Sequence, residues 1–244
     1  MIHRYETPQP ARQILDRAAP VLLAGLTRKE ILIGGGTALA ARWGHRSSSD
    51  IYITVLPAAF SRSIDRLIQM LGQTGIAQFE SGQGWMKGVY EEGEFGISST
   101  EPLLPVRVEP RERESIWNIA LESIEEILAR KILLRMNQNG EFVVRDFYDV
   151  VTAGDLAPQT LEAALTVLEN HQRKEIADEI THFGARLGNR ITNLGRPLLD
   201  VHRPEWLPTL ANRAALLIAD GHGLSRNQSP KAESFTGILS DATV

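Results

Sequence analysis

The sequence predicts an α+β protein, with a mixed-sheet core followed by a helical C-terminal domain. In the first 110 residues, short β-branched runs bounded by glycine or polar residues alternate with segments of helical periodicity. From about residue 115 the strand-like alternation disappears and helical spacing takes over. Apolar residues make up 43% and charged residues 23% of the 244 residues, which is typical of a folded globular chain and excludes global disorder.

The core is expected to contain three helices and four strands. In chain order these are a helix over residues 10–25 that Pro20 bends or divides, a strand at 31–33, a helix at 37–43, a strand at 51–56, a helix at 58–71, and a hairpin of strands 83–90 and 94–98. Three consecutive glycines, Gly34 to Gly36, join the first strand to the second helix. Such a turn brings backbone N–H groups to a helix N-terminus, which favours phosphate binding.

The helical part is expected to begin after a boundary near residues 110–115. Ser123 and Glu126 form a capping-box pattern that opens a helix over residues 124–137. Further helices are expected at 143–153, 160–171, 174–187 and 208–219. The domain prediction is therefore a core over 1–112, a helical domain over 113–221 and a flexible tail over 222–244, where large apolar residues are few.

The composition excludes several classes of protein. The absence of cysteine excludes disulfides, thiolate nucleophiles and cysteine-bound metals, so any metal must use oxygen or imidazole ligands. Apolar runs such as residues 18–26 are shorter than the roughly 20 residues that span a bilayer, and residues 1–6 lack the layout of a signal peptide. We expect a cytoplasmic protein with no membrane partner.

The charge distribution gives a nucleic-acid partner one plausible location. The net charge is −4, so the chain has no overall basic field. Residues 171–231 nevertheless contain nine Lys and Arg residues against six Asp and Glu residues. An RNA partner is thus expected to contact the helical domain, and the alternative is that these basic residues lie on solvated helix faces.

Two separated motifs carry the chemical interpretation. The first is Gly-Gly-Thr-Ala-Leu at residues 35–39 with His-Arg-Ser-Ser-Ser-Asp at 45–50. The second is Lys131 within Ala-Arg-Lys, followed by Arg-Asp-Phe-Tyr-Asp at 145–149. In this order the motifs resemble those of the AbiEii/AbiGii nucleotidyltransferases, which are toxins of abortive-infection and toxin–antitoxin systems. The resemblance covers about residues 31–150.

This resemblance implies a nucleotidyltransferase-like core and the transfer of a nucleotidyl group from an NTP to an RNA acceptor, with tRNA as the expected acceptor and a cognate antitoxin as a possible protein partner. It implies that Asp50 binds Mg²⁺, that Lys131 offsets triphosphate charge, and that Asp146 is a second ligand or base. The nucleotide-binding residues that it implies are Gly35, Gly36, Thr37, Arg46 and Ser48. This chemistry requires Mg²⁺ held by carboxylates beside the triphosphate.

The sequence departs from the family pattern at the second carboxylate. Where the family has Asp-x-Asp, this chain has Asp50 and Tyr52, and a neutral phenol is a poor Mg²⁺ ligand. For a third carboxylate the later strand offers only Glu94. The alternative function is therefore a catalytically reduced protein that keeps the fold to bind a nucleotide or a protein partner. A purely structural domain without a ligand is a third hypothesis.

Each motif residue also has a structural interpretation. The glycines can serve only as a tight connection, and Asp50 can simply begin a strand. Lys131 can extend its stem over the core and its ammonium to water. The remaining structural interpretations are a surface position for His45, an ion pair from Arg46 to Asp50 or Asp146, and an acidic helix face formed by Asp146 and Asp149 that pairs with Arg145 or Arg135. Lys87, outside the motifs, is expected to be a surface lysine, and the alternative is that it contacts phosphate.

Overall fold

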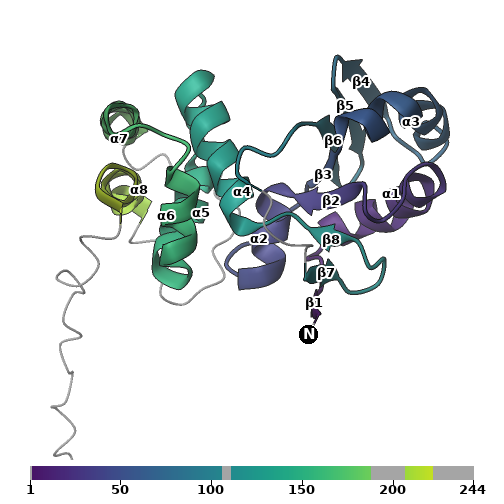
Figure 1. Cartoon of the computed structure of the whole chain (residues 1–244), viewed down its shortest axis with the longest axis horizontal. Coiled ribbons are helices and arrows are strands. Elements are labelled where there is room, and N and C mark those ends of the chain that lie inside the picture. The colour runs from purple at the N-terminus through teal and green to yellow at the C-terminus, as the bar shows by residue number, and fades with distance from the viewer. Residues whose placement is uncertain (1, 106–110, 188–206, 222–244) are drawn as a thin grey trace, which may run out of the picture.

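The computed structural model describes residues 2–105, 111–187 and 207–221 (Figure 1). Its core is an eight-stranded mixed sheet in the order β1-β7-β8-β2-β3-β6-β5-β4, which confirms the α+β prediction. The strands are β1 (His3–Tyr5), β2 (Ile31–Gly34), β3 (Ile51–Val55), β4 (Gln78–Gly82), β5 (Trp85–Tyr90), β6 (Gly93–Ser99), β7 (Glu112–Glu114) and β8 (Ala120–Leu121).

Helices flank this sheet and continue beyond it. Figure 1 shows α1 and α3 together beside the sheet and the later helices grouped at the other end of the molecule. The helices are α1 (Ala11–Gly25), α2 (Gly35–Trp43), α3 (Pro57–Leu71), α4 (Ile124–Ala129), the π-helix η1 (Arg130–Gln138), α5 (Val144–Leu156), α6 (Pro158–Leu165), α7 (Asn170–Leu187) and α8 (Leu207–Asp220). None of the helices within the described ranges is both long and apolar enough to cross a membrane.

At strand β3 one face of the sheet is covered and the other is open to solvent. It pairs antiparallel with β2 and parallel with β6. Ile51, Ile53 and Val55 are fully buried on the face where α1 packs against β3 and β6, while Tyr52 between them is exposed. Because side chains alternate along a strand, Asp50, Tyr52 and Thr54 share the other face. We call this second face the open face.

The predicted helices are present with small differences at their ends. Pro20 lies within α1 without dividing it. The side chain of Ser123 accepts a hydrogen bond from the backbone N–H of Glu126, as the capping-box pattern predicted. The helix expected over residues 124–137 is α4 followed by η1, and α7 runs through residues 171–174, where we expected two helices to meet.

The sheet extends further along the chain than the sequence indicated. The boundary expected after residue 112 falls within β7, and β8 at Ala120–Leu121 still pairs with β2. The sequence does not predict β1, β4, β7 or β8. β1, β4 and β7 have three to five residues that are mostly polar, and β8 has only two residues, so none of them gives a clear alternation. The tail predicted over 222–244 lies outside the described residues.

Candidate active site

The glycine turn connects β2 to α2, and side chains from distant parts of the chain lie against it. Gly35 has a φ of 64°, in the left-handed region that favours glycine. A Cβ on Gly36 would lie 1.9 Å from Nη2 of Arg46, and a Cβ on Gly34 would lie 2.3 Å from Oε2 of Glu122. An alanine at position 36 or 34 would therefore force Arg46 or Glu122 to move, whereas the turn itself requires glycine at position 35.

Thr37 and Ser48 hold the loop before β3 against the start of α2. Their hydroxyl oxygens are 2.6 Å apart, and the Thr37 hydroxyl also donates to the backbone carbonyl of Asp50. Both side chains are buried. Thr37 and Ser48, two of the residues predicted to bind nucleotide, thus fix the position of Asp50 relative to the glycine turn.

Arg46 binds a buried carboxylate on α5. Its Nε and Nη2 donate to Oδ1 and Oδ2 of Asp149 at 2.8 and 3.0 Å. His45 Nε2 lies 2.8 Å from the same Oδ1, and Lys131 Nζ lies 3.2 Å from Oδ2. Burial alone would raise the pKa of Asp149, but the guanidinium of Arg46 and the ammonium of Lys131 outweigh it and hold this pKa well below its ordinary value.

Lys131 and Asp146, which the sequence analysis placed together in the site, form an ion pair. Arg135 Nη1 lies 2.8 Å from the other oxygen of Asp146. Asp146 and Asp149 have no exposed surface, and Lys131 is only 6% exposed. The cluster of Arg46, Lys131, Asp146 and Asp149, which we call the buried ion cluster, joins the loop after α2 to η1 and α5. In this arrangement its charges neutralise one another.

Asp50 lies outside this cluster, at the start of β3 on the open face. Its side chain is 18% exposed, and its Oδ2 lies 3.6 Å from Nη1 of Arg145 on α5. Its Oδ1 accepts hydrogen bonds from the Ser49 hydroxyl at 3.0 Å and from the backbone N–H of Glu94 at 3.4 Å. Asp50 and Glu94 each precede the first paired residues of β3 and β6, so they are neighbours across these two strands.

Tyr52 lies beside these two carboxylates. Its ring lies over Gly96 and Gly35, because a Cβ on either glycine would lie 2.9 or 3.3 Å from ring carbons. Burial, followed by the negative charges of Asp50 and Glu94, raises the pKa of the Tyr52 phenol. Tyr52 is therefore neutral at pH 7, yet 39% of its surface is exposed at the point where the family pattern has a carboxylate.

The residues on the open face fit Mg²⁺ only in part. Within the described ranges, no three His, Cys, Asp or Glu side chains form a group that could hold a metal ion. Asp50 and Glu94 nevertheless offer two adjacent carboxylates, and Mg²⁺ is commonly held by one or two carboxylates together with substrate phosphates and water. The pair thus fits a Mg²⁺ ion that arrives with a triphosphate.

Three residues contact the site although the sequence indicated no clear role for them there. They are Glu94, which lies beside Asp50, Arg145, which pairs with Asp50, and Glu122, which lies against Gly34. Lys87 Nζ binds Glu94 Oε1 at 2.8 Å, and both side chains are partly exposed. Glu122 is 3% exposed, and burial raises its pKa although Arg130 lies 3.3 Å away. A strand-edge position was the only signal for Glu94, and Glu122 follows a strand too short to recognise.

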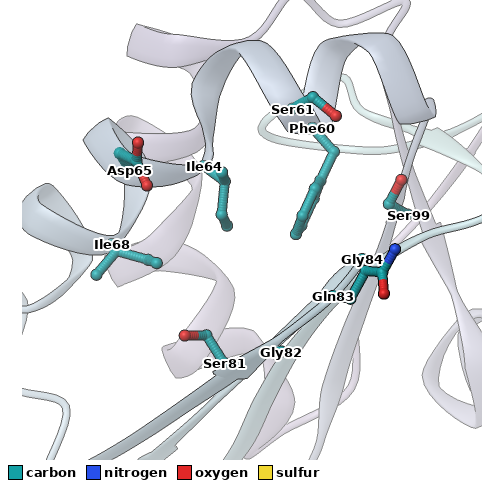
Figure 2. A pocket seen from close by; sticks show the side chains of 10 residues that line it. All are labelled: Phe60, Ser61, Ile64, Asp65, Ile68, Ser81, Gly82, Gln83, Gly84 and Ser99. Atoms are coloured by element: carbon teal, nitrogen blue, oxygen red, sulfur yellow. The ribbon is translucent and has the colours of Figure 1, made fainter.

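A pocket of about 520 Å³ lies away from these residues, between α3 and the turn that joins β4 to β5 (Figure 2). Ile64 and Ile68 extend from α3 toward Ser81 and Gly82 in this view. Ser99, which also lines the pocket, pairs with the buried Val55 and so belongs to the covered face of the sheet. The pocket and Asp50 are therefore on opposite faces.

Comparison with solved structures identifies the fold. A candidate nucleotidyltransferase from Helicobacter pylori aligns with a TM-score of 0.52 and 15% identity, covering 86% of this chain and 94% of its own. JHP933 from Helicobacter pylori aligns with a TM-score of 0.50 and 15% identity, covering 86% and 91%. The antibiotic-resistance factor ANT(2'')-Ia aligns with a TM-score of 0.37 and 16% identity over 71% of this chain and 91% of its own.

The first of these matches defines the class as the nucleotidyltransferase fold, which confirms this part of the prediction from sequence. Comparison of the sequence with protein-family models and with curated proteins gives no match. Membership of the AbiEii/AbiGii family therefore stays a prediction that rests on the two motifs.

Proposed function

We propose that the protein transfers a nucleotidyl group from an NTP to a hydroxyl acceptor at the open face. One observation carries this proposal: Asp50 and Glu94 lie side by side at the start of neighbouring strands, next to a glycine turn that opens a helix, in a nucleotidyltransferase fold. The backbone N–H groups in the first turn of α2 have no acceptor within the helix and favour anionic phosphate oxygens.

The proposed reaction assigns a role to each group. The acceptor hydroxyl gives its proton to solvent and its oxygen attacks the α-phosphorus, the bond from that phosphorus to the bridging oxygen of the β-phosphate breaks, and pyrophosphate leaves. Mg²⁺, when bound, would polarise the phosphate oxygens and lower the pKa of the acceptor hydroxyl. Asp50 and Glu94 would hold the ion, and the start of α2 would bind phosphate. Thr37 and Ser48 would keep Asp50 in register with that helix.

The acceptor that we propose is RNA, and specifically tRNA, bound through the helical domain. This assignment, like a toxin role restrained by an antitoxin and a role in defence against phage, rests on the resemblance of the two motifs. Residues 171–231 contain nine Lys and Arg residues against six Asp and Glu residues, and this excess of positive charge along the sequence favours binding of a phosphate backbone.

Incubation of the purified protein with Mg²⁺, each labelled NTP in turn and total tRNA tests the proposal. We expect label to appear in RNA with at least one NTP and to be lost in Asp50→Asn. Asp65→Asn is the matched control, because Asp65 is an exposed aspartate on α3. Transfer that survives Asp50→Asn, or no transfer with any NTP, would contradict the proposal.

Tyr52 favours a second candidate, a protein that binds a nucleotide without transferring it. Its neutral phenol lies where a second metal-binding carboxylate is expected, so a two-metal mechanism lacks a ligand. Calorimetric titration separates the two candidates. Nucleotide binding that is independent of Mg²⁺ and unchanged in Asp50→Asn would favour the second.

A further inference from the structure

The open face carries two partly exposed cations, and each of them is paired with one of the candidate metal ligands. We infer that Arg145 and Lys87 bind the phosphates of the substrate, and that a divalent cation on Asp50 and Glu94 releases them for this role. The inference rests on the proposed function and deepens it. It assigns the triphosphate to cations other than Lys131, to which the motif resemblance gave this role.

Lys131 and Arg46 are poorly placed to bind a triphosphate. Each is buried, and each contacts a carboxylate that has no exposed surface. Turning either cation toward a ligand would leave the negative charge of Asp146 or Asp149 buried with less positive charge beside it, which is strongly unfavourable. The buried ion cluster therefore holds these two cations in the protein interior.

Arg145 and Lys87 are in the opposite situation. Their side chains are 40% and 41% exposed. Arg145 lies 3.6 Å from Asp50, and Lys87 lies 2.8 Å from Glu94. The two pairs are close to each other, because Asp50 and Glu94 are neighbours at the start of β3 and β6 and the backbone N–H of Glu94 lies 3.4 Å from Oδ1 of Asp50. Ion pairs exposed to this degree are weak and exchange partners readily.

These four side chains, which we call the charge quartet, carry two positive and two negative charges. Without a ligand Arg145 neutralises Asp50 and Lys87 neutralises Glu94. The two carboxylates then attract a cation only weakly, and the two basic side chains attract an anion only weakly. A divalent cation on the two carboxylates would leave Arg145 and Lys87 without their partners, and a triphosphate would take their place. Binding of cation and anion is then coupled, and the coupling is reciprocal.

Titration with inorganic tripolyphosphate, with and without Mg²⁺, tests the quartet without requiring transfer. We expect Mg²⁺ to increase the affinity of the wild-type protein for tripolyphosphate about tenfold or more, and Arg145→Gln and Lys87→Gln each to reduce the affinity in Mg²⁺ about tenfold, because each removes a charge-assisted hydrogen bond. Arg66→Gln is the matched control. Arg66 is an exposed arginine on α3 and should have no effect.

Asp50→Asn gives the sharpest result, because it removes the partner of Arg145. Without Mg²⁺ this variant should bind tripolyphosphate more tightly than the wild type, and Mg²⁺ should no longer increase its affinity. The inference is overturned if the wild type does not bind tripolyphosphate in Mg²⁺, or if Arg145→Gln and Lys87→Gln bind it as the wild type does. If these binding results hold while no NTP is transferred to RNA, the quartet stands and the proposed transfer fails.

Discussion

Gly36→Ala should destabilise the protein through the buried ion cluster. The new methyl carbon would lie 1.9 Å from Nη2 of Arg46, far inside a van der Waals contact. An arginine usually avoids such a clash by moving, but Nε and Nη2 of this guanidinium both donate to Asp149, and Nη1 donates to the backbone carbonyl of Ser47. Moving it would separate Arg46 from a carboxylate that is fully buried.

The expected cost follows from that separation. Breaking a buried ion pair by removing one partner costs about 3–5 kcal/mol, and Lys131 remains beside Asp149, so we take the lower end, about 3 kcal/mol. For a chain of this size 1 kcal/mol corresponds to about 2–4 °C in Tm, so Tm should fall by about 6–12 °C. Gly72→Ala is the control, because Gly72 has helical dihedral angles and a Cβ there would meet only ordinary contacts of 3.4 Å or more.

Thermal unfolding followed by circular dichroism measures the difference, and urea unfolding gives the free energy. The double variant Gly36→Ala/Arg46→Ala isolates the cause, because without Arg46 the methyl group has room and should add almost nothing to the cost of Arg46→Ala. If Gly36→Ala is as stable as Gly72→Ala, or if its cost is the same with and without Arg46, this account of the glycine is refuted.

Three further predictions concern neighbouring residues. Lys131→Met should lower the free energy of unfolding by about 3 kcal/mol because Asp146 and Asp149 lose a shared cation; wild-type stability in urea would contradict a structural role. Burial raises the pKa of Glu122, so its carboxyl destabilises the fold increasingly as pH rises above about 4.3. The free energy of unfolding of Glu122→Gln should therefore rise relative to that of the wild type between pH 4 and pH 7. The same difference in free energy between variant and wild type at pH 4 and at pH 7 would refute this. Tyr52→Asp should tighten Mn²⁺ binding measured by electron paramagnetic resonance, because it places a carboxylate beside Asp50 and Glu94, and unchanged binding would count against this metal site.

Local patterns predicted the central elements of the fold but not the edges of the sheet. The isoleucines at residues 31 and 33 and at 51 and 53 are fully or almost fully buried, so their alternation with other residues predicted β2 and β3 correctly. β1 and β7 consist of His-Arg-Tyr and Glu-Arg-Glu, and they are strands because they pair with each other. Such pairing depends on contacts more than 100 residues apart, which no local window contains.

The structure brings several motif residues together, but in pairs that differ from those the sequence indicates. The motifs place Lys131 and Asp146 together, and these two residues form an ion pair. For Arg46 the resemblance implies nucleotide binding, and the structural alternative is an ion pair with Asp50 or Asp146. The partner of Arg46 in the structure is Asp149, for which the structural interpretation of the sequence gives Arg145 or Arg135 instead. Burial decides which charges remain available to a ligand, and it is a property of the tertiary fold that the motif residues do not encode.

The location of the nucleotide is the most direct test of this account. A crystal structure with Mg²⁺ and an NTP analogue whose α,β-bridging oxygen is replaced by a methylene group should place the triphosphate over β3 and β6, beside Asp50 and in contact with Arg145. A nucleotide bound elsewhere, for example in the pocket between α3 and the β4–β5 turn, with no contact to Asp50, would contradict it.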